Sequence, residues 1–304
     1  MRLIFFLLAC LRVLATAQAA DGAPKLKVGI TLHPYYSFVT AIAGERAEVV
    51  PLVDAGFNSH NYNPQPADLK RAMTLDALVL NGVGHDPFAL EIVAAAGRKD
   101  SLPLIHANAQ VSLVPIAGLE GAEKAVNPHT FISISAAIQQ VNTIADGLSR
   151  LSPADAPEFR RNARAYTGRL RRLKAETMTR IAALPRLELR CASVHGSYDY
   201  LLSEFGLEIA FVVEPAPGMQ PSATQLRRTI ETLKARKIQV LFAEEEFPAA
   251  YVETIRAATG VRTRFLKHLT SGAYSAEYFE AGMRYNLDQL AEALLDATQA
   301  NDGK

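Results

Sequence analysis

The alternation of apolar and polar residues along the chain follows two periods. Short apolar runs rich in β-branched residues predict strands, and the first set covers 27–32, 47–53, 77–80, 102–105 and 111–115. A second set covers 187–194, 207–213, 238–243 and 262–266. Helical patterns separate many of these runs, which is typical of a parallel α/β sheet. Because the pattern restarts, we predict two doubly wound α/β lobes, over residues 21–152 and 186–304.

A polar segment between the two sets has the period of one long helix. Apolar residues recur every three or four positions from Phe159 to Leu184, and no glycine or proline interrupts them after Gly168. We predict a single rigid helix over residues 153–185 that links the lobes and limits hinge bending. Its basic face is interpreted as a solvated surface. A further amphipathic pattern over 274–298 predicts a helix that covers the second sheet.

Residues 1–20 have the composition of a secretory signal peptide. Arg2 precedes an apolar run, and the small residues that follow favour cleavage after Ala19 or Ala20. The run is too short, and too interrupted by Arg12, to cross a bilayer. Cys10 ends a sequence that resembles a lipoprotein acylation box, but only nine residues precede it, so its lipidation is left open. We therefore expect an exported protein.

The charge balance argues against nucleic acid and anionic membranes as partners. The chain has 32 basic residues, of which Arg2 and Arg12 lie in the signal peptide, so 30 remain against 31 acidic residues. Such a chain has no net field that would attract polyanions. Cys191 is the only cysteine after the signal peptide. The core, and not a disulfide, must therefore stabilise the exported protein.

Three histidines lie in separate loop segments that follow strands or precede helices. His60 follows the second predicted strand, His129 precedes a helix, and His195 follows a strand directly. The carboxyl ends of parallel strands are where open α/β sheets bind ligands. Neutral imidazoles suit Zn²⁺ better than Mg²⁺ or Ca²⁺, which prefer oxygen ligands. The sequence therefore predicts a divided metal site, with two histidines from the first lobe and one from the second.

The other histidines are weaker candidates from sequence. His33 and His106 follow strands, and we interpret them as residues that pack or line the cleft. His85 lies in a glycine-rich loop after a strand and is interpreted as a packing residue. His268 lies after the last strand and is kept as a possible further ligand.

Several motifs in a fixed order carry a resemblance to a known family. They are His60-x-Tyr62-x-Pro64-x-Pro66-x-Asp68, Asn81-Gly82-x-Gly84, Asn127-Pro128-His129, Val194-His195 with Tyr198, Gly206-Leu207, and Glu214 before Pro221-Ser222. This set resembles the zinc/manganese solute-binding proteins of ABC importers and covers nearly all of the exported chain. The resemblance implies two α/β lobes, a long linking helix and one metal ion in the cleft between the lobes.

The resemblance also implies the ligands, with His60, His129 and His195 as the first three. Manganese-preferring members have a carboxylate at the third position, so a histidine there implies zinc, in agreement with the preference of imidazole nitrogen for Zn²⁺ over Mn²⁺. The acidic fourth ligand of many relatives is missing, because the segment 265–272 contains no acid. The fourth ligand is left open between water and four side chains, His268, Glu244, Glu245 and Glu246.

We therefore expect a periplasmic monomer that captures one Zn²⁺ and delivers it to the permease of an ABC importer, without catalysis. Because imidazole binds metal only when deprotonated, affinity should fall as the pH drops through about 6.5. An adhesin or metallochaperone on the same scaffold is one alternative. A secreted zinc hydrolase is another, but the sequence has no His-Glu-x-x-His helix and no nucleophile elbow.

Overall fold

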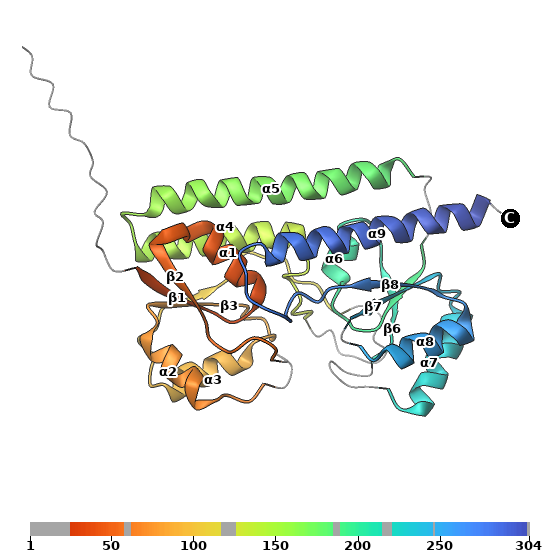
Figure 1. Cartoon of the computed structure of the whole chain (residues 1–304), viewed down its shortest axis with the longest axis horizontal. Coiled ribbons are helices and arrows are strands. Elements are labelled where there is room, and N and C mark those ends of the chain that lie inside the picture. Colours follow the sequence, from red (N-terminus) through yellow and green to blue (C-terminus); the bar gives the residue numbers. More distant parts are fainter. Residues whose placement is uncertain are drawn as a thin grey trace, which may run out of the picture.

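Two α/β lobes lie side by side beneath two long helices, α5 (Ala156–Ala182) and α9 (Tyr278–Asp302) (Figure 1). The computed structural model describes residues 25–57, 62–116, 126–184, 189–214, 221–245 and 247–302. The predicted signal peptide and Cys10 therefore lie outside the described residues. Within those ranges, no helix has both the length and the apolar composition that a membrane span requires.

The N-terminal lobe is built on a parallel sheet in the order β2-β1-β3-β4. The strands are β1 (Leu26–Ile30), β2 (Ala47–Pro51), β3 (Ala77–Leu80) and β4 (Leu104–His106). One face is covered by α1 (His33–Ala43) and α4 (Ile134–Leu151), and the other by α2 (Pro66–Thr74) and α3 (Pro87–Ala95) (Figure 1). A short 3₁₀ turn, Gly44–Arg46, leads from α1 into β2.

The strand predicted over 111–115 is wrong. This segment forms only one isolated bridge, between Pro115 and Val126. Its amides are bonded elsewhere, since Val111 N–H donates to Asn108 O at 3.0 Å and Val114 N–H donates to the Tyr200 hydroxyl at 3.1 Å. A proline at the end of the run supplies no ladder hydrogen bond.

The C-terminal lobe repeats the arrangement, with strand order β6-β5-β7-β8 and all pairs parallel. Its strands are β5 (Cys191–Ser193), β6 (Ile209–Val212), β7 (Val240–Glu244) and β8 (Arg262–Leu266). The helices are α6 (Asp199–Ser203), α7 (Ala223–Ala235) and α8 (Ala249–Thr259). The Cys191 side chain is buried in the core, where burial raises the pKa of its thiol to about 12.

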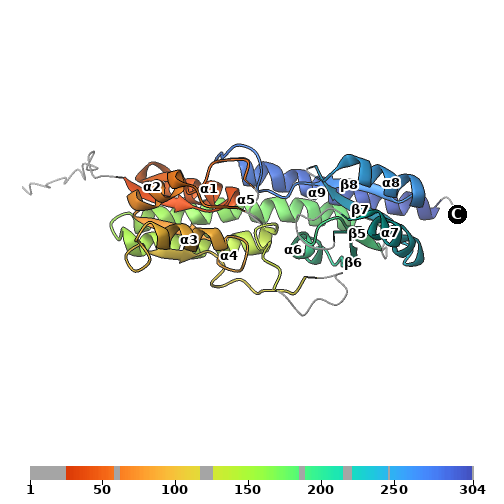
Figure 2. The same ribbon diagram turned by 90° about the horizontal axis from the view of Figure 1, so that it is seen from below.

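Two helices, and not one, bridge the lobes. Figure 2 shows α5 running along both lobes and α9 extending from the middle of the molecule over the C-terminal lobe. The helix predicted over 274–298 covers the second sheet and also contacts the first lobe at its start, where the Phe279 ring packs edge-on against Phe38 with centroids 4.7 Å apart. One hydrophobic cluster contains side chains of α1, α4, α5, α9, β5 and β7. Hinge bending would have to disrupt this shared core.

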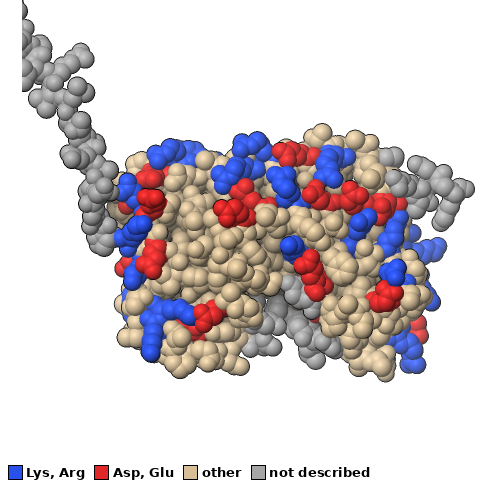
Figure 3. Space-filling model, in the orientation of Figure 1, with Lys and Arg blue, Asp and Glu red and all other residues tan. Residues whose placement is uncertain are grey.

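Charged side chains of both signs alternate along the upper edge of the molecule (Figure 3). Part of the basic face of α5 is paired with α9, through Arg169 to Glu280 at 2.8 Å and Arg180 to Asp288 at 2.5 Å. These pairs are largely exposed and contribute little to stability. They connect the two bridging helices along their exposed sides.

The close packing of α9 against the segment after β8 depends on Gly282. A methyl group at this position would lie 2.3 Å from Leu269 Cδ2, whereas one at Gly168 in α5 would meet only Arg172 Nη1, at 3.8 Å. We expect Gly282→Ala to lower the free energy of unfolding by about 1–3 kcal/mol through overpacking. Gly168→Ala, the matched control, should raise it by about 0.5–1 kcal/mol. Urea unfolding of both variants checks this, and equal stabilisation of both would contradict it.

Candidate metal centre

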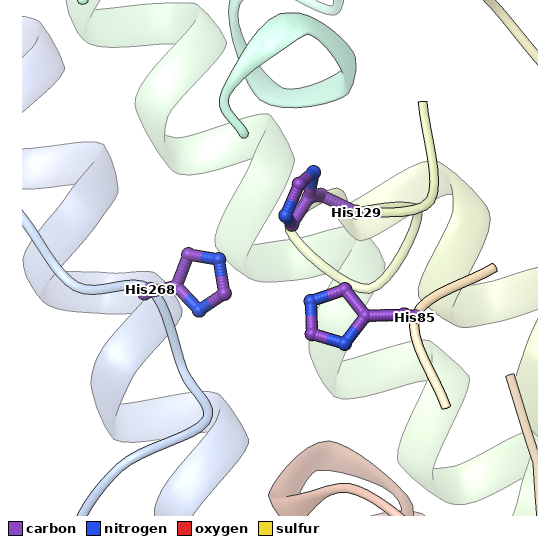
Figure 4. A group of neighbouring side chains, drawn as sticks. All are labelled: His85, His129 and His268. Atoms are coloured by element: carbon purple, nitrogen blue, oxygen red, sulfur yellow. The ribbon is translucent and has the colours of Figure 1, made fainter. Parts of the chain in front are cut away.

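Five potential metal donors from both lobes meet at the carboxyl ends of the two sheets. Ligand atoms of His85, His129 and His268 lie within 4.8 Å of one another, and so do those of His195, Glu244 and His268. All four imidazoles are buried. Figure 4 shows the rings of His85, His129 and His268 reaching from three separate segments toward a common space. The site thus forms where strand ends of one lobe face strand ends of the other.

His129 is oriented by the residue two positions before it. Asn127 Oδ1 accepts a hydrogen bond from the His129 backbone N–H at 3.0 Å and lies 2.8 Å from His129 Nδ1. An amide oxygen can only accept, so Nδ1 carries the hydrogen and the lone pair of the ring is on Nε2. That Nε2 atom lies 3.2 Å from Nε2 of His195.

His195 is oriented in the same way by a carboxylate. Its Nδ1 atom lies 2.5 Å from Glu214 Oε2, which directs Nε2 into the site. Burial lowers the pKa of His195, but the hydrogen bond to Glu214 and the nearby carboxylates raise it, and the net shift is upward. A carboxylate that holds the second nitrogen of an imidazole is the usual support of a metal-binding histidine.

Glu244 and His268 are the two proposed fourth ligands that the structure places at the site. Ser197 Oγ donates to Glu244 Oε1 at 3.1 Å, and desolvation raises the pKa of the Glu244 carboxyl group. His268 Nδ1 lies 2.7 Å from Thr270 Oγ1. Glu245 is exposed and belongs to neither group of potential donors among the described residues. The third acid of this run, Glu246, lies outside the described residues.

His85 lies at the site, contrary to its interpretation as a packing residue. Its ring centroid is 4.9 Å from that of His129 and 5.7 Å from that of His268. The loop is held by the next residue, Asp86, whose carboxylate accepts from Thr31 Oγ1 at 2.5 Å and from the amides of residues 81 and 82 at 2.6 and 3.0 Å. Burial raises the pKa of Asp86. The sequence feature that could have indicated His85 as a donor is its glycine-rich loop after a central strand.

The structure does not place the remaining histidines at the group of donors. His60 lies outside the described residues and stays a prediction. His33 packs away from the donors, stacked on Tyr274 with centroids 4.1 Å apart and with Nε2 2.8 Å from Gly272 O. His106 is exposed at the end of β4. The packing interpretation therefore suits His33, and His106 contributes nothing to the group of donors.

Residues 28–293 match the sequence model of the family described as zinc-uptake complex component A, periplasmic. The chain belongs to this family. Its relatives include the zinc-binding lipoprotein AdcA of Streptococcus pneumoniae, which is 27% identical over 289 residues and 92% of this chain. The chain spans only 56% of the length of AdcA. The manganese ABC transporter substrate-binding lipoprotein PsaA of Streptococcus pneumoniae is 23% identical over 96% of this chain and 95% of its own length.

Solved structures agree with this assignment. The SBP FpvC from Pseudomonas aeruginosa, in complex with Mn²⁺, is 52% identical, with a TM-score of 0.85 over 90% of this chain and 100% of that chain. ZnuA is 25% identical, with a TM-score of 0.74 over 89% of this chain and 100% of that chain. The predicted family and the two-lobed parallel α/β fold are confirmed. The family is described as a component of a zinc-uptake complex, and PsaA as a substrate-binding lipoprotein of an ABC transporter, so the prediction that the chain is not an enzyme is also confirmed.

The support that Glu214 gives to His195 can be tested by removing its charge. We expect Glu214→Gln to weaken the binding of a divalent transition-metal ion by about 10–100-fold, the usual effect of changing the partner of a metal-bound imidazole. Competition with a chromogenic chelator measures the affinity. Glu245→Gln is the matched control, because this neighbouring carboxylate is exposed, and it should bind as the unaltered protein does. Unchanged affinity in Glu214→Gln would show that the contact plays no part in binding.

Proposed function

We propose that this protein captures a divalent transition-metal ion between its lobes and delivers it to the membrane permease of an ABC importer. The observation that carries the proposal is the pairing of His129 and His195. Their Nε2 atoms are 3.2 Å apart, and a polar side chain holds the other nitrogen of each ring. Two imidazoles fixed in this way are preorganised to bind one ion.

Zinc is the cargo that the donor types favour. Imidazole nitrogen binds Zn²⁺ more tightly than Mn²⁺ or Fe²⁺ in a comparable site. The family carries zinc uptake in its description, and AdcA is described as zinc-binding. Other relatives are described with manganese, iron or nickel. We therefore propose one Zn²⁺ per chain as a cargo, held by His129, His195 and the predicted His60 together with donors from His85, His268 or Glu244.

The proposed place of action is the periplasm, and the partner is the permease. The signal-peptide pattern of residues 1–20 supports export, and several relatives are described as lipoproteins of ABC transporters, which keeps lipidation of Cys10 open. A monomer suffices, because one chain supplies all the donors named. The zinc hydrolase alternative has no support from the family, whereas an adhesin or metallochaperone differs only in where the metal goes.

Metal content tests capture directly. Protein purified without chelator should carry about one transition-metal ion per chain by elemental mass spectrometry, because preorganised imidazoles retain such ions. We expect His129→Ala, His195→Ala and His60→Ala each to lose most of this metal. His106→Ala changes an exposed histidine and should keep it. Metal that persists in all three site variants would show that these histidines are structural.

Delivery needs a test in the source organism. Deletion of the gene should abolish growth in medium depleted of zinc by a chelator, and added zinc should restore it, because uptake would then rely on low-affinity routes. Cell-associated zinc measured after a short exposure gives the uptake rate. Unchanged uptake, combined with metal binding by the purified protein, would favour the adhesin or metallochaperone alternative.

A further inference from the structure

A short helix of the C-terminal lobe contacts both ends of the His129 segment, residues 127–135. We propose that Asp199, Tyr200 and Glu204, on α6 or directly after it, form an interlobe clasp that positions His129. They are positioning residues, because neither group of potential metal donors among the described residues includes them. The proposal rests on the proposed function and concerns how a captured ion is retained. It assigns part of that retention to hydrogen bonds made outside the metal centre.

The start of the His129 segment is held by Asp199 and Tyr200. Asn127 Nδ2 donates to Asp199 Oδ2 at 2.6 Å, and the Tyr200 hydroxyl donates to Asn127 O at 2.9 Å. The same hydroxyl accepts from Val114 N–H at 3.1 Å. Burial raises the pKa of Tyr200, so the hydroxyl stays protonated and able to donate at neutral pH. One phenol of the C-terminal lobe thus connects two segments of the N-terminal lobe.

The end of the His129 segment is held by Glu204. Its Oε1 atom accepts from the Ser135 backbone N–H at 2.8 Å and from the Ser133 hydroxyl. Amides in the first turn of a helix have no partner within the helix, and a carboxylate there also meets the positive end of the helix dipole. Lys174 Nζ lies 3.1 Å from Glu204 Oε2 and donates to Ser135 Oγ at 2.7 Å. The Glu204 side chain is only 7% exposed, so solvent screens these contacts weakly.

The N-terminal lobe holds the middle of the same segment. Asn81 Nδ2 donates to Pro128 O at 3.1 Å, and Gln140 Nε2 donates to Thr130 Oγ1 at 3.0 Å. His129 therefore lies between contacts that alternate between the two lobes along the chain. Donors of a binding site must be placed to within about 0.5 Å. Opening of the clasp would leave His129 supported from one lobe only, which should shorten the time that an ion stays bound.

Hydrogen exchange on the metal-free full-length protein tests the clasp apart from metal binding. We expect Tyr200→Phe and Glu204→Ala each to speed the exchange of backbone amides in residues 127–135 by about tenfold, the scale of a lost hydrogen bond between buried groups. Glu204→Gln should restore part of the protection, because its carbonyl oxygen can still accept from the Ser135 amide. Unchanged exchange in both of the first two variants would overturn the clasp.

Transfer of Zn²⁺ from the loaded protein to a chromogenic chelator measures retention. We expect Tyr200→Phe and Glu204→Ala to release Zn²⁺ about tenfold faster than the unaltered protein, the scale of a lost outer support of a metal-bound imidazole. Glu204→Gln should release it at an intermediate rate. A role in folding alone would lower the free energy of urea unfolding and leave the release rate unchanged. Faster exchange with unchanged release would therefore overturn the positioning role.

Glu158→Ala is the matched control for the loss of a carboxylate. Glu158 pairs with Arg46 at 3.1 Å and Arg161 at 3.9 Å instead of with the His129 segment, so its removal should change neither rate. Circular dichroism identifies any clasp variant that fails to fold, and the other variant then decides. Unchanged rates in every folded clasp variant would overturn the proposal and leave metal capture intact. If the unaltered protein binds no Zn²⁺, the proposed function fails, and exchange in the metal-free protein still decides whether the clasp holds the segment.

Discussion

The side-chain amide of Asn127 is the contact on which the geometry of the metal centre depends. Its oxygen orients the imidazole of His129, and its nitrogen donates to Gly196 O at 3.0 Å and to Asp199 Oδ2 at 2.6 Å in the other lobe. One buried amide therefore fixes a donor of the N-terminal lobe relative to the loop that carries His195. Loss of the oxygen or the nitrogen of this amide would leave its buried polar partners without a hydrogen bond. Each such group lowers the free energy of unfolding by about 1–3 kcal/mol.

The fold around the site also holds donors of one lobe in place relative to donors of the other. The loops that carry the donors follow the carboxyl ends of the parallel strands. These ends of the two sheets face each other, so donors far apart in sequence meet in space. The bridging helices and the hydrophobic cluster between the lobes hold these edges at a nearly fixed separation. Short loops on such a rigid support place imidazoles more accurately than long flexible loops would.

Sequence reasoning recovered the scaffold better than the full set of donors. The strands over Ala77–Leu80 and Arg262–Leu266 have the predicted bounds, because apolar runs bounded by turns determine them locally. The structure brings together the predicted His129 and His195, each of which adjoins a strand or helix end, with their Nε2 atoms 3.2 Å apart. The approach of His85 to the other imidazoles, and the contact of the first turn of α9 with the first lobe, were not predicted for one physical reason. Whether a loop or a helix end meets the opposite lobe depends on packing between segments that no local pattern records.

The contacts of the donor loops also determine how the site can release an ion. The His129 segment is bound to both lobes, since Asn81 Nδ2 donates to Pro128 O at 3.1 Å and the Tyr200 hydroxyl donates to Asn127 O at 2.9 Å. Glu204 of the C-terminal lobe also accepts from the amide of Ser135, at 2.8 Å, at the start of α4. Wide separation of the lobes would break all of these bonds.

A shift of one donor loop would break fewer hydrogen bonds than a wide separation of the lobes. The segment after β8, which carries His268, is connected to the N-terminal lobe through residues 272–275. The carbonyl groups of Gly272 and Ser275 contact His33 and Ser37, and the Tyr274 hydroxyl donates to Val53 O at 3.2 Å. Withdrawal of His268 alone would remove one potential donor and leave the paired imidazoles of His129 and His195 in place. Affinity then falls in steps, because each lost metal–nitrogen bond leaves the remaining donors in place. Release through single loops is therefore compatible with a rigid pair of bridging helices, whereas release through a wide hinge motion is not.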